Sequence, residues 1–238
     1  CIVASISCSR PRRDNSSSAV EMASPRSPYF GQPTPGITPV RFAHEVVSTD
    51  AIELNGVFTP DLREFFFTRL MDGVDIMHHS VFEDGEWSAP RPLLLFPNQA
   101  WSVAVDMAVS PDGQELYFLG QHPHEYAPQE PGYDLWVSRR MDGGWSTARV
   151  VPPPVSTSAQ EIYPVVVADG SLYFTSNRPG GLGPYDIYRA QRLADGSFAE
   201  PVNVGPPVNS EFGVGDTYVA YDESYLIFSS RRPGGLGN

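Results

Sequence analysis

The segment "GQHPHEYAPQEPG", residues 120–132, concentrates side chains that are suited to chemistry: His122, His124, Glu125 and Tyr126. Imidazole and carboxylate groups serve as metal ligands and as general acids or bases. A third metal ligand at fixed geometry is not identifiable in the sequence, so we favour a solvated loop and predict no metal and no cofactor. Long loops on a rigid scaffold often carry function, which makes these four residues candidates for ligand binding.

Arginine is placed in a second candidate segment, which occurs twice. "SNRPGGLGPYDIY", residues 176–188, returns as "SRRPGGLGN" at residues 230–238. Asn177 and Arg178 in the first copy, and Arg231 and Arg232 in the second, could bind carboxylate or sugar groups. The alternative is that the arginines pair with carboxylates of neighbouring blades, such as Asp134 or Asp186, leaving the motif as a turn. Its proline and glycines suit a turn, and no helix follows to bind phosphate, so we favour the turn.

These segments lie within a larger repeat. The strand cores "REFFFT", "QELYFL", "GSLYFT" and "SYLIFS" align at Phe67, Phe118, Phe174 and Phe228. A turn with Asp precedes each core, and three cores are followed by a strand expected to begin at Asp75, Asp134 and Asp186. A second turn closed by an aromatic residue comes next, then an extended segment with proline. Four short antiparallel strands in a repeated unit predict an all-β fold, a β-propeller of four-stranded blades. A β-sandwich is the alternative, but it does not require a repeated sequence.

The combined motifs make the resemblance to a family specific. "SPDGQELYF", "YFTSNRPGGLGPYDIY" and "DGGWSTA" together resemble the WD40-like, TolB-type propeller repeat of bacterial cell-envelope proteins. The similarity covers residues 40–238. It implies a propeller, export to the periplasm or the outer membrane, and a general capacity for binding, because these repeats serve many functions.

The predicted organisation is a disordered tail and linker over residues 1–38, followed by the propeller over 39–238. We expect a ring-closing strand at 40–47, blades at about 51–97, 101–155 and 160–208, and a partial blade at 214–238. The expected ring is therefore partial, with three blades and half of a fourth, as in a fragment of a longer protein. The first strands of the blades should line the central channel, where Glu161 and Asp216 would make it partly acidic.

The tail contains both cysteines, Cys1 and Cys8. "CIVASISC" followed by a polar linker resembles the end of a lipoprotein signal with Cys8 as the lipid-modified residue, and a plain disordered terminus is the alternative. No stretch approaches the length of about 20 apolar residues that a spanning helix needs. We therefore expect no membrane-spanning segment in the body, and a lipid anchor at Cys8 is one of the two alternatives for the tail.

Charge and missing motifs limit the function. The formal net charge of −12 argues against nucleic acid as a partner, because phosphate would be repelled. No nucleophile elbow, zinc-protease helix or complete dinucleotide fingerprint is present in the sequence. We therefore expect a non-catalytic binding module for a protein or glycan ligand. The ligand should bind on the loop-rich face, where the loops between second and third strands and the connections between blades emerge, and the oligomeric state is open. The alternative is a carbohydrate-active enzyme, a hydrolase or a metal-dependent lyase, on the same fold.

Overall fold

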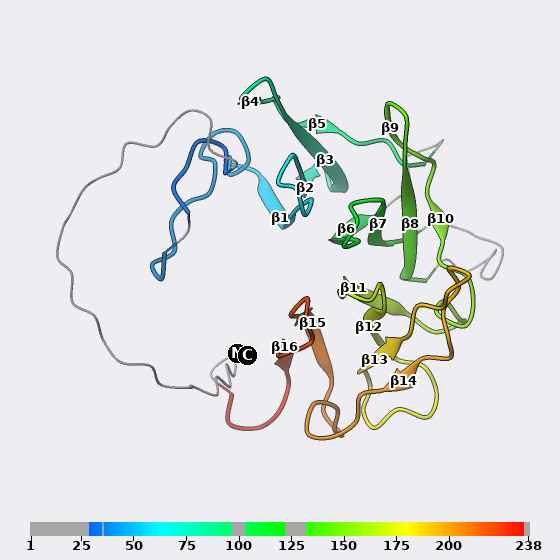
Figure 1. Ribbon diagram of the computed structural model, residues 1–238. Coiled ribbons are helices and arrows are strands. Elements are labelled where there is room, and N and C mark those ends of the chain that lie inside the picture. The colour runs from blue at the N-terminus through cyan, green and yellow to red at the C-terminus, as the bar shows by residue number, and fades with distance from the viewer. Residues whose placement is uncertain (1–28, 35, 97–102, 122–131, 236–238) are drawn as a thin grey trace, which may run out of the picture.

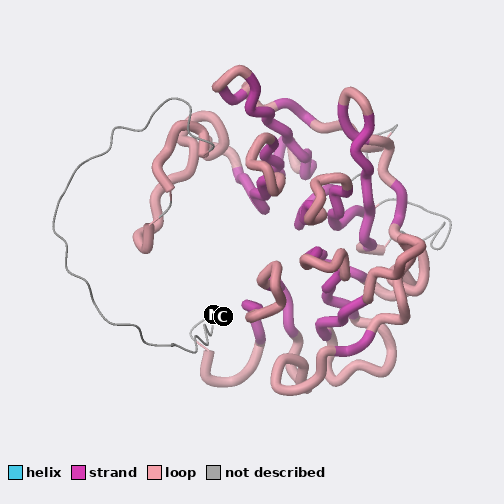
Figure 2. Tube along the Cα trace, in the orientation of Figure 1, coloured by secondary structure: helices cyan, strands magenta, loops and turns pink. Residues whose placement is uncertain are grey.

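The computed structural model describes residues 29–34, 36–96, 103–121 and 132–235. Within these residues all regular secondary structure is β-strand, as Figure 2 shows. No helix in this part of the chain is long and apolar enough to cross a bilayer. The predicted all-β class is confirmed.

The strands form three complete antiparallel units and one two-stranded unit around a common centre (Figure 1). The first unit contains β1 (Ile52–Phe58), β2 (Glu64–Met71), β3 (Val74–Glu83), β4 (Glu86–Trp87) and β5 (Arg91–Pro92). The second contains β6 (Ala104–Val109), β7 (Glu115–Gly120), β8 (Asp134–Met141), β9 (Gly144–Trp145) and β10 (Arg149–Val150). The third contains β11 (Glu161–Val166), β12 (Leu172–Ser176), β13 (Asp186–Ala190) and β14 (Val202–Asn203), and the last contains β15 (Val214–Val219) and β16 (Leu226–Ser230).

Each unit is a propeller blade, with β1, β6, β11 and β15 innermost (Figure 1). In the first two blades the outermost strand is divided into two short pieces, because β4 and β5 both pair with β3, and β9 and β10 both pair with β8. The partial ring of three blades and half of a fourth agrees with the prediction.

Strand register shows which positions of the repeat are equivalent. The aromatic cores pair with the third strands as Phe67 with His78, Phe118 with Trp136, and Phe174 with Tyr188. Two positions earlier on the third strand, Asp134 and Asp186 are equivalent to Ile76. The third strand of the first blade therefore aligns from Ile76, and Asp75 lies one position ahead of the place that the sequence pattern suggested.

Adjacent residues of each core strand are buried on opposite sides of the blade. Phe118 packs with Phe66 between the first two blades, whereas its neighbour Tyr117 packs with Phe174 between the second and third. All four side chains are at most 1% exposed. Consecutive apolar residues in the core strands are therefore explained by a blade that is covered on both faces.

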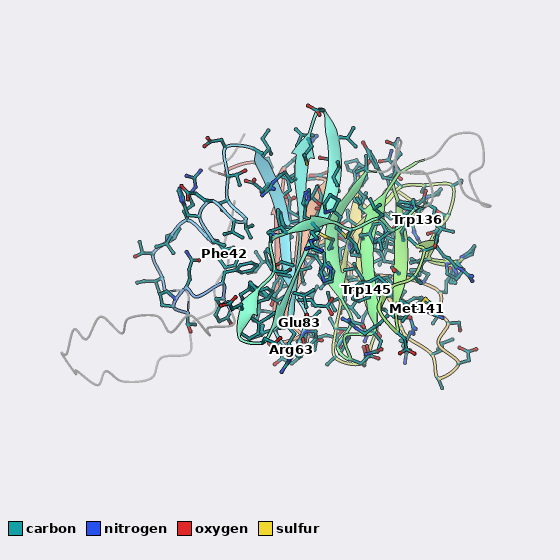
Figure 3. The ribbon with its side chains drawn as sticks, turned by 90° about the horizontal axis from the view of Figure 1, so that it is seen from above. Phe42, Arg63, Glu83, Trp136, Met141 and Trp145 are labelled. Carbon is teal, nitrogen blue, oxygen red and sulfur yellow. The ribbon has the colours of Figure 1, made fainter. Side chains whose placement is uncertain are left out.

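The segment before β1 is not a regular strand within the described residues. Residues 42–47 are turns with an isolated bridge from His44 to Ser48, and they do not join the sheet of the first blade. Phe30 and Phe42 instead pack on Phe65, on the flank of the blade where Figure 3 labels Phe42. Closure of a ring through residues 40–47 stays a prediction.

A largely buried carboxylate joins the first two blades near the turns where Figure 3 labels Arg63 and Glu83. Glu64 of β2 accepts hydrogen bonds from Arg140 of β8 and from the indole of Trp145, and it also pairs with His79. Burial alone would raise the pKa of Glu64, but the hydrogen bonds from His79 and Arg140 lower that pKa to about 2. The carboxylate is therefore ionised at neutral pH and holds two blades together.

Candidate functional site

Each innermost strand has a β-bulge in its middle. The register of β1, β6, β11 and β15 shifts at Leu54/Val57, Val105/Ala108, Ile162/Val165 and Gly215/Tyr218. One residue in each bulge has a positive φ angle: Asn55 at 51°, Asp106 at 52°, Tyr163 at 54° and Asp216 at 45°. A bulge re-aims the side chain at one point of a strand, and here the same device recurs in every blade.

The four bulge residues meet at a cavity of about 510 Å³ in the central channel. Its remaining wall is largely apolar and aromatic, with Phe58, Met107, Tyr218 and Tyr221 among the lining residues. A volume of this size, with an apolar wall and a few converging polar groups, is typical of small-ligand sites.

The polar groups in the cavity interact with one another. Asn55 acts to lower the pKa of Asp106, and the carboxylate of Asp216 acts to raise the pKa of Tyr163. The hydroxyl of Ser229, on β16, donates to Asp216 at 2.8 Å. Strands that are far apart in the sequence therefore contribute to one site.

Two carboxylates in this cavity repel each other. Burial, and after it the negative charge of Asp216, together raise the pKa of Asp106 to about 6. Burial followed by the charges of Asp216 and Asp106 raises the pKa of Tyr163 to about 12, so the phenol keeps its proton. The site is acidic at neutral pH and offers several hydrogen-bond acceptors to a ligand.

Glu161 lies only two residues before Tyr163 on β11 but has a different environment. It is fully buried and accepts hydrogen bonds from the Thr157 hydroxyl at 2.8 Å and the Ser176 hydroxyl at 3.1 Å. Arg178 completes the set with a 3.1 Å ion pair. Burial raises the pKa of Glu161, while Thr157 and Arg178 act to lower it. Glu161 therefore belongs to an internal network and does not line the cavity.

Arg178 connects this network to the preceding blade. Its guanidinium donates to the carbonyl oxygens of Pro154 at 3.4 Å and Val155 at 2.6 Å, and it lies over the rings of Phe174 and Tyr188. The observed carboxylate partner is in the same blade, not Asp134 or Asp186 as the structural alternative suggested. The guanidinium is thus engaged on several sides.

The same arrangement occurs at two other places in the chain. Arg232 donates to the carbonyl oxygens of Pro207, at 2.6 Å, and Val208. Arg69 donates to those of Val46 and Val47, at 3.2 and 3.1 Å, and pairs with Glu53. These arginine clamps fasten the segment that enters a blade to the core strand of that blade. Residues 46–47 before β1 therefore occupy the position of an inter-blade connection.

The remaining predicted site residues do not line the cavity or lie outside the described part of the chain. His122, His124, Glu125, Tyr126 and Cys8 lie outside the described residues. The side-chain oxygen of Asn177 accepts a 2.8 Å hydrogen bond from the amide of Gln160, and Arg231 is exposed. Among the described residues no group of three or more His, Cys, Asp and Glu side chains could hold a metal ion.

Sequence reasoning identified Asp216 but missed Asn55, Asp106 and Tyr163. A signal was present, because each bulge residue precedes the aromatic core residue of its blade by 11 or 12 positions. The residue types differ from blade to blade, so the repeat does not reveal them by identity. Only the shared bulge marks them as one set.

Comparisons with known proteins agree with this architecture. No protein-family model and no curated protein matches the sequence. Among solved structures, the chain is similar to one assigned as TolB from Agrobacterium tumefaciens, with a TM-score of 0.51 and 16% identity over 77% of this chain and 56% of that one. It is also similar to TolB from Acinetobacter baumannii, with a TM-score of 0.49 and 15% identity over 80% of this chain and 40% of that one.

The periplasmic gluconolactonase PpgL from Pseudomonas aeruginosa gives a TM-score of 0.46 at 16% identity, over 74% of this chain and 49% of that one. The chain spans about half or less of the length of these structures. Identities at this level bear on the fold alone, and the likeness to the Agrobacterium structure agrees with the repeated four-stranded blades. The chain therefore has the fold of a TolB-type β-propeller.

Proposed function

We propose that this chain is a non-catalytic binding module of an exported bacterial protein, and that its ligand binds in the channel cavity. The observation that carries the proposal is the convergence of Asn55, Asp106, Tyr163 and Asp216 on one cavity of ligand size. In contrast, Arg178, Glu161 and Asn177 on the loop-rich face already bond to neighbouring segments. Of the two ligand classes that the sequence suggested, the cavity favours a glycan over a protein.

The chemistry of the wall supports a glycan. Sugar hydroxyls donate hydrogen bonds to carboxylates, and the C–H face of a pyranose packs on aromatic rings such as Phe58, Tyr218 and Tyr221. The two carboxylates and these three aromatic rings all line the cavity. The residues His122, His124, Glu125 and Tyr126, together with the exposed Arg231, are proposed to extend the contact surface on the loop-rich face.

A glycan array followed by titration calorimetry on the purified chain tests the proposal. Asp106→Ala and Asp216→Ala should each weaken binding of the array hit by about tenfold or more, because each removes a charge-assisted hydrogen bond. Asp195→Ala, at an exposed turn of the third blade, is the matched control and should leave affinity unchanged. Absence of glycan binding, or affinity that depends on none of the cavity residues, would overturn the proposal. A protein ligand with the same dependence would refute the glycan and retain the site.

A carbohydrate-active enzyme is the second candidate, and one observation favours it. Asp106, with its pKa raised to about 6, interacts electrostatically with a second carboxylate, Asp216, and a protonated carboxyl beside an ionised one is the acid–base pair of many glycosidases. Turnover of a bound glycan that Asp106→Asn abolishes while binding persists would establish this alternative. Binding without turnover by the unaltered chain supports the module.

The cellular location is part of the proposal. The envelope resemblance of the repeat supports export to the periplasm or the outer membrane, and Cys8 is the proposed site of a lipid anchor. Metabolic labelling with a fatty acid should mark the unaltered protein expressed with an export signal, and Cys8→Ala should lose the label.

A further inference from the structure

Five arginines of this protein share one kind of environment. Each forms an ion pair with a glutamate, and each guanidinium carbon lies 4.5–5.8 Å from the centroid of an aromatic ring. The five sets are Arg69 with Glu53 and Phe67, Arg140 with Glu64 and Trp145, Arg178 with Glu161 and Phe174, Arg189 with Glu223 and Tyr173, and Arg192 with Glu115 and Phe198. A carboxylate and the face of an aromatic ring both attract a cation. In this fold, the two groups together therefore hold a positive charge.

The channel cavity combines the same two kinds of group. Its wall includes the carboxylates of Asp106 and Asp216 and the rings of Phe58, Tyr163 and Tyr218. Of the described residues that form this wall, none is an arginine, a lysine or a histidine. No described arginine lies over any of these three rings. The wall therefore has the carboxylates and rings that hold arginine elsewhere, without an arginine from the described part of the chain.

Asp106 shows that this difference belongs to the interior of the ring. Its strand, β6, lies between β1 and β11, which are the inner strands of two complete blades (Figure 1). Besides burial, the negative charges of Asp216 and then Asp75 raise the pKa of Asp106, and Asn55 acts to lower it. A half-buried carboxylate among like charges is electrostatically unfavourable when ionised. A bound cation would relieve this repulsion.

We propose that the glycan bound in the channel cavity carries a protonated amine, which pairs with Asp106 and Asp216. This inference rests on the proposed function, because it names the class of glycan that binds at the same site. The ligand is an amino sugar whose nitrogen is not acetylated, so that its ammonium group donates hydrogen bonds to the two carboxylates. The rings of Phe58, Tyr163 and Tyr218 are available to the ammonium and to the C–H face of the sugar.

Charge separates this ligand from other candidates. An N-acetylated sugar presents a neutral amide in place of the ammonium and leaves the repulsion between the carboxylates unrelieved. A glycan with carboxylate or sulfate groups would add to that repulsion. The net charge of −12 acts in the same direction, because it favours the approach of cations over anions. A metal ion is less suited, since the described residues contain no group of three or more His, Cys, Asp and Glu that could hold one.

Two trisaccharides of the same linkage test the inference, one of glucosamine and one of N-acetylglucosamine. They differ in the acetylation of the nitrogen. Titration calorimetry with the unaltered chain, at neutral pH and low ionic strength, should show that the glucosamine trisaccharide binds about tenfold more tightly or better, because its hydrogen bonds are charge-assisted. Added salt should reduce this preference, since it screens the attraction. Equal or tighter binding of the N-acetylated trisaccharide overturns the inference.

The two cavity carboxylates should account for the preference. Asp106→Asn and Asp216→Asn each keep the shape of the side chain and remove its charge. Each should reduce the ratio of the two affinities by about threefold or more, mainly by weakening the glucosamine trisaccharide. Asp195→Asn, at an exposed outer turn, is the matched control and should leave the ratio unchanged. A ratio that neither cavity variant alters overturns the inference, even where both trisaccharides bind.

A carboxyl carbon NMR titration of Asp106 gives a readout at the site itself. When the glucosamine trisaccharide is bound, the pKa of Asp106 should fall, because a nearby ammonium favours the ionised carboxylate. The N-acetylated trisaccharide should not lower this pKa. An unchanged pKa in the glucosamine complex would overturn the pairing with Asp106.

The remaining outcomes distinguish this inference from the proposed function. If the glucosamine trisaccharide does not bind but another glycan from the array binds with the same dependence on Asp106 and Asp216, the inference is overturned and the proposed function is retained. If no glycan binds, both are overturned. A trilysine peptide that binds more tightly than the glucosamine trisaccharide would assign the cavity to a cationic polypeptide, and this result also overturns the amino sugar.

Discussion

Two positions of β11 place polar side chains in different environments, one enclosed by partners and one open to a cavity. Glu161, at the start of the strand, is fully buried and bonds to Thr157, Ser176 and Arg178. Tyr163, two positions later, is turned by a bulge into a 510 Å³ cavity beside the carboxylates of neighbouring blades. The first environment supplies nearly every partner that its carboxylate requires, whereas the second presents polar groups to open space.

The difference shows how a repeat can carry both stability and specificity. The arginine clamp recurs at Arg69, Arg178 and Arg232, where it fastens the first, third and last blades to the segments that enter them. The bulge also recurs, but its residue changes from Asn to Asp to Tyr to Asp around the channel. The clamp residue is the same in these three blades, whereas the bulge residue that lines the cavity varies.

Removing the clamp is expected to have the largest effect. Arg178→Ala leaves the fully buried Glu161 without its cation and should lower the free energy of unfolding by about 3–5 kcal/mol. Urea denaturation measures the change, and the exposed Arg231→Ala is the control, expected within about 0.5 kcal/mol of the unaltered protein. If Arg178→Ala is as stable as the control, the clamp is not structural.

Glu64, the carboxylate that joins two blades, provides a second test of whether a buried charge with partners stabilises the fold. Its pKa of about 2 lies below the unfolded value of 4.5, so it stabilises the fold above pH 4.5, and this contribution disappears as pH falls towards 2. Glu64→Gln should therefore cost about 3 kcal/mol at pH 7, and the cost should shrink in acid. Unfolding free energies from pH 3 to 7 measure this, and a cost that is independent of pH would contradict the ionised pair.

In the cavity, ionisation of a carboxyl group has the opposite effect on the stability of the fold. The pKa of Asp106, about 6, lies above the unfolded value of 3.8, so its charge destabilises the fold above pH 6, and the penalty is relieved as pH falls towards 3.8. Asp106→Asn should stabilise the chain by about 2–3 kcal/mol at pH 8 and have little effect at pH 4. Thermal melts at both pH values give the comparison. A destabilising Asp106→Asn would place this residue with Glu161 among the structural groups.

The smallest expected effect tests the coupling across the channel. Asp216→Asn removes a negative charge that raises the pKa of Asp106, so that pKa should fall by less than about one unit. A carboxyl carbon NMR titration of Asp106 measures the shift, and Asp195→Asn, whose carboxylate lies at an exposed outer turn, should leave it unchanged. If the pKa of Asp106 is unchanged in Asp216→Asn, the two carboxylates do not interact electrostatically.

Much of the fold could be predicted because it is local and repeated. The core strands around Phe67, Phe118, Phe174 and Phe228 each carry consecutive apolar residues, and in the three complete blades the structure covers both faces of such a strand. The segment at 40–47 was harder to predict: we expected a ring-closing strand there, and the sequence does not show what the segment contacts. It has the clamp contacts of a connection, from Arg69 to Val46 and Val47, without forming a strand.

The candidate site was predicted less well, for a physical reason. Asp216 could be assigned to a first strand, but the use of Glu161 depends on Arg178, which comes from a loop 17 positions later. The cavity needs Asn55, Asp106, Tyr163 and Asp216 to approach one another from separate blades, and sequence distance carries no information on that approach.

The sequence by itself determined the blade, its turns and its repetition, because hydrophobic pattern and turn chemistry act over a few residues. Only the tertiary structure decided which polar residues are enclosed by partners and which face the channel. That choice depends on bulges of the inner strands and on contacts between blades, and such contacts form only when distant parts of the chain come together.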